Sequence, residues 1–96
     1  MAGELITRFI DRDAVTILGT AATGIEIGSD GKGSQLEVYN AGAKTAYRGG
    51  STTTSSKGIP LGPGDTVTIR GAALAKVYFR CGAGDTTELR LVTGVS

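Results

Sequence analysis

The order of side chains in Lys76-Val77-Tyr78-Phe79-Arg80-Cys81 indicates the fold of this chain. Successive side chains of a strand face opposite sides of a sheet, so Val77, Phe79 and Cys81 share one apolar face. Six other runs of β-branched, aromatic or alternating residues are bounded by Gly, Asn, Asp or Ser: 15–18, 25–27, 35–39, 44–48, 65–70 and 87–92. About seven short strands, each with one solvated face, predict an all-β fold, either a compact antiparallel β-sandwich or a jelly-roll-like barrel.

The core is predicted from the apolar positions within these runs. We expect it to contain Val38, Val67, Ile69, Val77, Phe79, Leu89 and Leu91. Long helices are not expected, because the chain holds 16 glycines, which lose backbone entropy in a helix. Turn residues cluster at 29–33, at 81–85 and in Asn40-Ala41-Gly42. The last of these resembles a short hairpin loop in which Asn or Gly adopts a positive φ.

The chain length limits how the protein can be stabilised. With 96 residues there is room for one domain. A domain of this size buries only about 60–65 % of its unfolded surface, so it often needs disulfides, metals or partner subunits. The chain has no His and a single cysteine, Cys81, which excludes an internal disulfide and argues against a metal centre. We therefore expect no cofactor, and support from oligomerisation or from docking on a larger body.

Residues 1–13 differ in character from the β-sandwich domain predicted at 14–96. Leu5, Ile6, Phe9 and Ile10 are apolar and helically spaced, but the segment is too short to form a stable isolated helix in water. We assign it as an N-terminal arm. It is expected either to close the chain's own core as an edge strand or helical turn, or to dock on a neighbouring chain.

A long connection is predicted at 49–64. A polar stretch rich in Ser and Thr is followed there by Gly58-Ile59-Pro60-Leu61-Gly62-Pro63-Gly64, whose prolines remove hydrogen-bond donors from any sheet ladder. Loops of this length in small domains are usually functional or mobile. The segment is therefore expected to be either a binding loop or a solvated crossover between the two sheets.

Charge and hydropathy argue against several classes of protein. Ten Lys and Arg balance nine Asp and Glu without forming a basic run, so no nucleic-acid surface is indicated. No stretch approaches the roughly 20 apolar residues of a membrane span, and residues 1–13 do not resemble a signal peptide. Cys81 lies in an apolar run and is expected to be a buried thiol rather than a nucleophile.

The sequence contains no evident catalytic constellation. An enzyme without His would need carboxylates, Lys or Tyr in a pocket, whereas Glu37 and Glu88 fall on solvated strand faces. Asp11-Arg12-Asp13 has a D-x-D pattern but lacks the further ligands and the glycine of a calcium loop. We therefore expect that the chain is not an enzyme.

Three tyrosines leave one alternative function open. Tyr39, Tyr47 and Tyr78 all fall in predicted strands. Together they could form an aromatic platform on which sugars stack, as in a carbohydrate-binding module. Without any Trp, however, three tyrosines on a β surface more often serve in cross-strand packing or at an interface.

Several short motifs follow one another in a distinctive order along the sequence. These are Leu36-Glu37-Val38-Tyr39-Asn40-Ala41-Gly42, Thr45-Ala46-Tyr47-Arg48-Gly49-Gly50 and Gly58-Ile59-Pro60-Leu61-Gly62-Pro63-Gly64-Asp65, followed by strands at 76–79 and 87–92. This order resembles that of small β-sandwich virion structural proteins of tailed phages, and it covers about 60 % of the chain.

The resemblance implies a non-enzymatic virion protein, most like a capsid decoration or cement protein that binds the outer capsid lattice and stabilises the head. It implies the major capsid protein as partner, a homo-oligomer with a trimer favoured, and a place on the capsid surface after synthesis in the host cytoplasm. A tail, baseplate or fibre component is the alternative within the same class. The predicted partner-binding residues are Leu5, Ile6, Phe9, Ile10, Thr53, Ile59 and Leu61.

Overall fold

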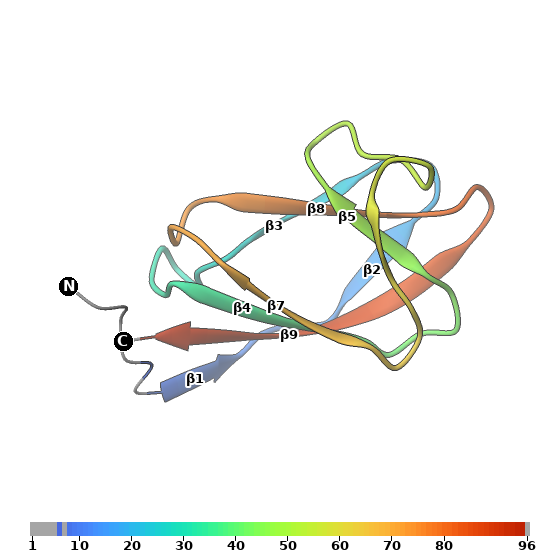
Figure 1. Ribbon diagram of the computed structural model, residues 1–96. Coiled ribbons are helices and arrows are strands. Elements are labelled where there is room, and N and C mark those ends of the chain that lie inside the picture. The colour runs from blue at the N-terminus through green and yellow to red at the C-terminus, as the bar shows by residue number, and fades with distance from the viewer. Residues whose placement is uncertain (1–5, 7, 96) are drawn as a thin grey trace.

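The computed structural model describes residue 6 and residues 8–95. Within these residues the chain forms nine strands and no helix (Figure 1). The strands are β1 (Arg8–Asp11), β2 (Val15–Leu18), β3 (Thr23–Glu26), β4 (Gln35–Asn40), β5 (Ala46–Gly49), β6 (Ile59–Leu61), β7 (Thr66–Arg70), β8 (Lys76–Cys81) and β9 (Thr86–Val95). In this part of the chain there is consequently no helix that could cross a membrane.

The strands form two antiparallel sheets. Sheet A has the order β1-β9-β4-β7, with β2 also paired to β9, and sheet B has the order β3-β8-β5-β6. The molecule is elongated, with extents of 42 × 22 × 21 Å. β1 and the last residues of β9 lie at one end, together with the β3–β4 and β7–β8 loops (Figure 1). The predicted all-β sandwich is confirmed.

The long strand β9 organises sheet A. Its residues 92–95 pair with β1 and its residues 86–89 pair with β2, so β1 and β2 form one interrupted strand along its edge. Asp11 is opposite Val92 and Val15 is opposite Leu89, which leaves three residues, 12–14, facing two residues, 90–91. An extra residue of this kind is a β-bulge, and bulges bend a strand and redirect its side chains.

Arg12 lies in this bulge and joins the two sheets. Its Nη1 donates to the carbonyl oxygens of Glu26, the last residue of β3 in sheet B, and of Ile27, which follows it, and to Thr93 Oγ1 of β9 at 3.1 Å. The Thr93 hydroxyl in turn donates to the Ile27 carbonyl at 3.0 Å. This edge of sheet A therefore lies against the β3 edge of sheet B. Residues 8–11 of the predicted arm are an edge strand of sheet A.

The hydrophobic core lies between the two sheets. Its buried members are Ile17, Ile25, Ile27, Leu36, Val38, Ala46, Leu61, Ile69, Val77, Phe79, Cys81, Leu89 and Leu91. Six of the seven predicted core residues are among them, and the seventh, Val67, packs against them partly buried. The alternation of apolar and polar side chains therefore placed the core correctly.

One strand, β6, lies inside the connection predicted at 49–64. Its Pro60 is opposite Tyr47. Because proline has no amide hydrogen to donate to a neighbouring strand, its presence in the sequence favours a loop over a strand. β6 is an edge strand of sheet B, however, and a missing donor is tolerated at an edge. Residues 50–58 join two strands of the same sheet, so they are not a crossover. The crossover to sheet A is the short turn at 62–65.

The segment Asn40-Ala41-Gly42 is not a hairpin loop. It leads from β4 in sheet A to β5 in sheet B, so the strands that it joins do not pair. The prediction of a positive φ at Asn40 or Gly42 is also wrong, since neither residue has one. The other two predicted turns do contain left-handed glycines, among them Gly31 with φ 73° and Gly84 with φ 80°. The role of Asn40 lies in the hydrogen bonds of its side chain, which are described below.

Candidate binding surface

Four of the predicted partner-binding residues belong to the N-terminal segment. Leu5 lies outside the described residues. Ile10 is half-buried opposite Thr93, on the face of β1 that looks toward sheet B. Phe9 points the other way, is opposite Gly94 and is 56 % exposed. Ile6 is half-buried on the same outer face, because a β-carbon on Gly94 would lie 3.1 Å from Ile6 Cγ2.

The other three predicted residues belong to the 49–64 segment. Ile59 is 58 % exposed, whereas Thr53 and Leu61 are only 5 % and 6 % exposed. Leu61 is part of the core, and Thr53 is enclosed by its own loop: a β-carbon on Gly49 would lie 2.5 Å from Thr53 Oγ1. The prediction that Thr53 and Leu61 present their side chains to a partner is therefore corrected. Both stabilise the domain from within.

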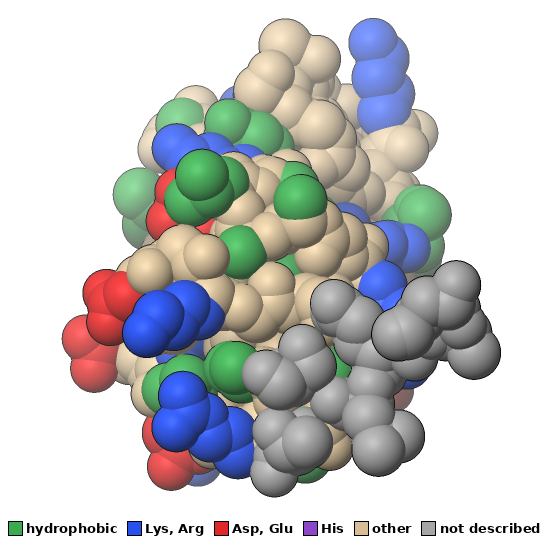
Figure 2. All heavy atoms as spheres, turned by 90° about the vertical axis from the view of Figure 1, so that its left-hand side faces the viewer, with side chains coloured by type: hydrophobic (Ala, Val, Ile, Leu, Met, Phe, Trp, Pro, Cys, Tyr) green, Lys and Arg blue, Asp and Glu red, His purple; other side chains and the backbone are tan. Residues whose placement is uncertain are grey.

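The two exposed side chains, Phe9 and Ile59, do not share one surface. Phe9 is on β1, at the edge of sheet A that Arg12 ties to β3. Ile59 is on β6, at the opposite edge of sheet B from β3. The molecule therefore carries exposed apolar side chains at two opposite edges. Figure 2, which looks onto the end where β1 and β9 meet, likewise shows hydrophobic side chains as separate patches among polar atoms.

Sequence analysis did not single out two further exposed apolar residues. Leu74 is 69 % exposed in the β7–β8 loop, and Leu18 is 43 % exposed at the end of β2. Leu74 is the one large apolar residue in Gly71-Ala72-Ala73-Leu74-Ala75, a run of small residues between two strands. A single leucine in a loop of small residues has few neighbours to pack against, and this pattern could have predicted that Leu74 is exposed.

The three tyrosines do not form one platform. Tyr47 and Tyr78 both point outward from sheet B, where Tyr47 is opposite Arg80 and Tyr78 is opposite Gly49. Tyr39 is on β4 of sheet A, opposite Arg90 and 41 % exposed. The predicted set of three is thus reduced to a pair on one sheet and a single ring on the other.

Asn40, which is fully buried, explains the motif Asn40-Ala41-Gly42. Its Nδ2 donates to the carbonyl oxygens of Lys44 at 2.8 Å and Leu61 at 2.9 Å. Its Oδ1 accepts from the Gly42 amide at 3.1 Å and from Thr87 Oγ1 at 2.7 Å. We call Asn40 and these four partners the Asn40 node. An amide side chain has two donors and two acceptor lone pairs, and all four are used here.

The Asn40 node also explains a second of the three motifs, Gly58-Ile59-Pro60-Leu61-Gly62-Pro63-Gly64-Asp65. This segment supplies the Leu61 carbonyl, and its turn is held by hydrogen bonds from the Gly64 amide to the Asn40 carbonyl and from the Asn40 amide to the Asp65 carbonyl. The two motifs therefore act together to join the ends of β4 and β6. Their shared role is to fix the architecture at this place.

The pattern Asp11-Arg12-Asp13 surrounds a guanidinium that bridges the two sheets. Both carboxylates are exposed, and Arg12 between them is committed to Glu26, Ile27 and Thr93. Among the described residues, no three His, Cys, Asp or Glu side chains come together as metal ligands. Arg12 is thus accounted for by its role in joining the two sheets.

Cys81 is a free and buried thiol, as predicted. Its Sγ lies 3.5 Å from the Ile17 carbonyl oxygen, to which it donates. Burial, with the nearby negative charge of Asp85, raises the pKa of the Cys81 thiol above its usual range. A buried thiol that resists ionisation is a poor nucleophile, which fits a structural role.

No protein-family model matches this chain, and neither a curated protein nor a solved structure matches it.

Proposed function

We propose that this protein is a non-enzymatic virion structural protein that binds the outer capsid lattice of a tailed phage and stabilises the head. The proposal combines the resemblance over residues 36–92 with the β-sandwich fold. The observation that carries it is the placement of the exposed side chains Phe9 and Ile59 at opposite edges of the sandwich. A subunit built in this way can contact a neighbour on each side.

Contacts between two different surfaces of the same subunit form closed rings when the rotation between neighbours closes. A ring of three copies on the capsid surface, bound to the major capsid protein, is the assembly that we favour. Burying one such side chain contributes roughly 1.5–3 kcal/mol before the costs of association are subtracted. One contact of this kind is weak, but repetition over a lattice multiplies it.

Point variants at the two edges test this proposal. Undecorated capsids of the phage that encodes the chain are incubated with wild type, Phe9→Ser or Ile59→Ser, and bound protein is measured by co-sedimentation. Each variant is expected to bind about tenfold more weakly, which corresponds to about 1.4 kcal/mol. Leu18→Ser is the matched control and is expected to bind like wild type. Leu18 is exposed on the same edge of sheet A as Phe9 but at the other end of β9, opposite Thr86, whereas Phe9 is opposite Gly94. Normal binding by both edge variants would overturn the proposal.

A tail, baseplate or fibre component is the alternative within the same class. Such components are present in tens of copies per particle, whereas a decoration protein covers the lattice in hundreds. Quantitative mass spectrometry of purified virions separates the two. A copy number in the tens would mean that the protein is a tail, baseplate or fibre component and not a decoration protein.

Carbohydrate binding is the second candidate, and one observation favours it. Tyr47 and Tyr78 point outward from the same face of sheet B, with Arg80 in the strand beside Tyr47. The Arg80 guanidinium is positioned by the Gly19 carbonyl, to which Nε and Nη2 both donate at 3.3 Å. A glycan array probed with wild type, Tyr47→Ala and Tyr78→Ala tests this candidate. Tyr39→Ala is the matched control, because Tyr39 lies on the other sheet.

A further inference from the structure

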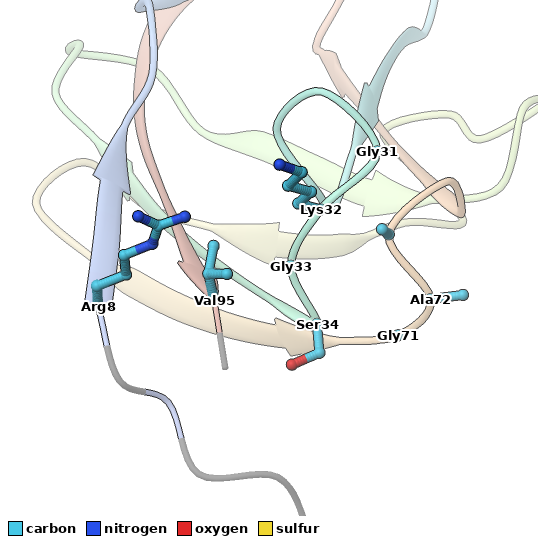
Figure 3. A pocket seen from close by; sticks show the side chains of 9 residues that line it. Arg8, Gly31, Lys32, Gly33, Ser34, Gly71, Ala72 and Val95 are labelled. Carbon is cyan, nitrogen blue, oxygen red and sulfur yellow. The ribbon is translucent and has the colours of Figure 1, made fainter.

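A hollow of about 600 Å³ lies at the end of the sandwich where β1 and β9 meet. Its walls come from β1, from the end of β9 and from the β3–β4 and β7–β8 loops (Figure 3). Three glycines and two alanines line it together with Ser34, Val95 and two cations, Arg8 and Lys32. We call it the terminal hollow. None of the residues described so far as a binding candidate lines it.

The walls of the terminal hollow are held by backbone hydrogen bonds. The Ser34 amide donates to the Gly94 carbonyl of β9, and the Gly71 amide donates to the Ser34 carbonyl, both at 3.1 Å. The Gly28 amide donates to the Ala73 carbonyl at 2.8 Å. The two loops are thereby tied to each other and to β9. A site with walls fixed in this way loses little conformational entropy when a ligand binds.

Glycine is required in these walls for a structural reason. Gly33 has a φ of 117°, and a β-carbon on it would lie 2.4 Å from Thr93 Cγ2. Gly31 also has a positive φ, 73°. Without side chains at these positions the backbone itself forms the wall, and a ligand can approach it closely.

The charges at the terminal hollow are of one sign. Arg8 and Lys32 extend from opposite walls toward each other in Figure 3. Within residue 6 and residues 8–95, neither cation has a hydrogen-bond or ion-pair partner, and no described Asp or Glu lines the hollow. Two cations directed at one space repel each other, and an anion placed between them removes that repulsion.

The surroundings favour a carboxylate carried by a peptide over a nucleic acid. A nucleic-acid backbone is held by many cations along a track, whereas this hollow has two. Leu74 stands at its rim, since a β-carbon on Gly31 would lie 3.8 Å from Leu74 Cδ2, and it is 69 % exposed. We propose that the terminal hollow binds an acidic segment of a partner protein, with one carboxylate held between Arg8 and Lys32 and an adjacent apolar residue against Leu74.

This inference goes beyond the proposed function, because it does not require the partner to be a capsid protein, and its test uses no capsid. The probe is an acetylated and amidated hexaglutamate, titrated into the ¹⁵N-labelled protein and followed by the amide signals of Gly31, Gly33 and Gly71. These three signals are expected to shift together in a saturable manner. Binding is expected to weaken when the ionic strength is raised about tenfold, because exposed charges are screened.

Paired variants show whether the two cations form the site. The double variant Arg8→Ser/Lys32→Ser is expected to bind the hexaglutamate about tenfold more weakly or worse. The matched control is Lys57→Ser/Arg90→Ser, which removes two exposed cations elsewhere and changes the net charge by the same amount, from +1 to 1 − 2 = −1. The control is expected to bind within about twofold of wild type. Arg8→Lys/Lys32→Arg, which keeps both charges, is expected to retain binding.

Three results would overturn the inference. The first is the absence of shifts at the three glycines at millimolar hexaglutamate. The second is an equal loss of binding in the control pair, which would mean that the peptide responds only to net charge. The third is tighter binding of a hexathymidylate than of hexaglutamate at the same amides, which would assign the hollow to nucleic acid.

Discussion

The two ends of the sandwich use polar groups in opposite ways. At one end, the Asn40 node satisfies every hydrogen-bonding atom of a buried amide within the domain. At the other end, the terminal hollow directs two cations into open space without a described partner. The first arrangement stabilises the fold, since a buried polar group is costly unless it is paired. The second leaves charge available for binding.

This difference shows that a distinctive motif need not mark a functional site. The motifs Asn40-Ala41-Gly42 and Gly58-Ile59-Pro60-Leu61-Gly62-Pro63-Gly64 are among the most distinctive of the sequence, and both are used to join β4 to β6. The residues around the terminal hollow belong to no such motif. In a small domain the most distinctive residues can therefore be those that hold the fold together.

The largest expected effect is at the centre of the Asn40 node. Asn40→Ala removes four hydrogen bonds and leaves the Leu61 carbonyl without its Asn40 donor. The free energy of unfolding, measured by urea denaturation, is expected to fall by about 3–5 kcal/mol. Thr87→Val removes only one of these bonds and is the control, with an expected loss of about 1 kcal/mol. Equal losses for the two variants would contradict the picture of a cooperative node.

A second effect concerns the space around the node. In Gly42→Ala the new β-carbon would lie 2.0 Å from Thr87 Oγ1 and 2.8 Å from the Glu88 amide nitrogen. The backbone must shift, and the expected loss is about 2–3 kcal/mol. Gly50→Ala is the matched control, because nothing lies within 4 Å of its β-carbon, and it is expected to change stability by less than about 0.5 kcal/mol. If Gly42→Ala left the free energy of unfolding unchanged, the packing around Gly42 would be less tight than these distances indicate.

A smaller effect is expected at Cys81. Near neutral pH, Cys81→Ala is expected to cost about 1 kcal/mol, because it leaves a small void in the core. The pKa of the folded thiol is raised, so its contribution is fully present below the ordinary thiol pKa of about 8.5 and is lost as the pH rises through the raised value. The stability difference between wild type and variant, measured by urea denaturation, should therefore shrink at alkaline pH. If the stability difference between wild type and Cys81→Ala instead grew with pH, the pKa of the folded thiol would not be raised.

The smallest effect is expected at the other end. Arg8→Ser and Lys32→Ser remove exposed charges that have no described partner. Each is expected to change the free energy of unfolding by less than about 0.5 kcal/mol, measured by the same urea titration. A loss above about 1.5 kcal/mol for either would mean that this cation supports the fold, and the contrast between the two ends would disappear.

The fold could be predicted from the sequence, but little of the candidate site could. Alternation identified the core strands, because a period of two is a local property of the chain. It missed β6, since Pro60 signals a loop unless the strand is known to be an edge. The partner residues were only partly placed, because apolar character alone does not tell Ile59, which is exposed, from Leu61, which is in the core.

The amino-acid sequence by itself determined the all-β class, six of the buried core residues and the buried state of Cys81, because each follows from local patterns of apolar residues. Only the tertiary structure decided what the polar residues do. Asn40 and Arg12 became structural because the packing of two sheets brought distant carbonyl groups to them. Arg8 and Lys32, 24 residues apart, became one candidate site because β1 and the β3–β4 loop meet at the same end. Contacts of such long range depend on topology, which no local pattern specifies.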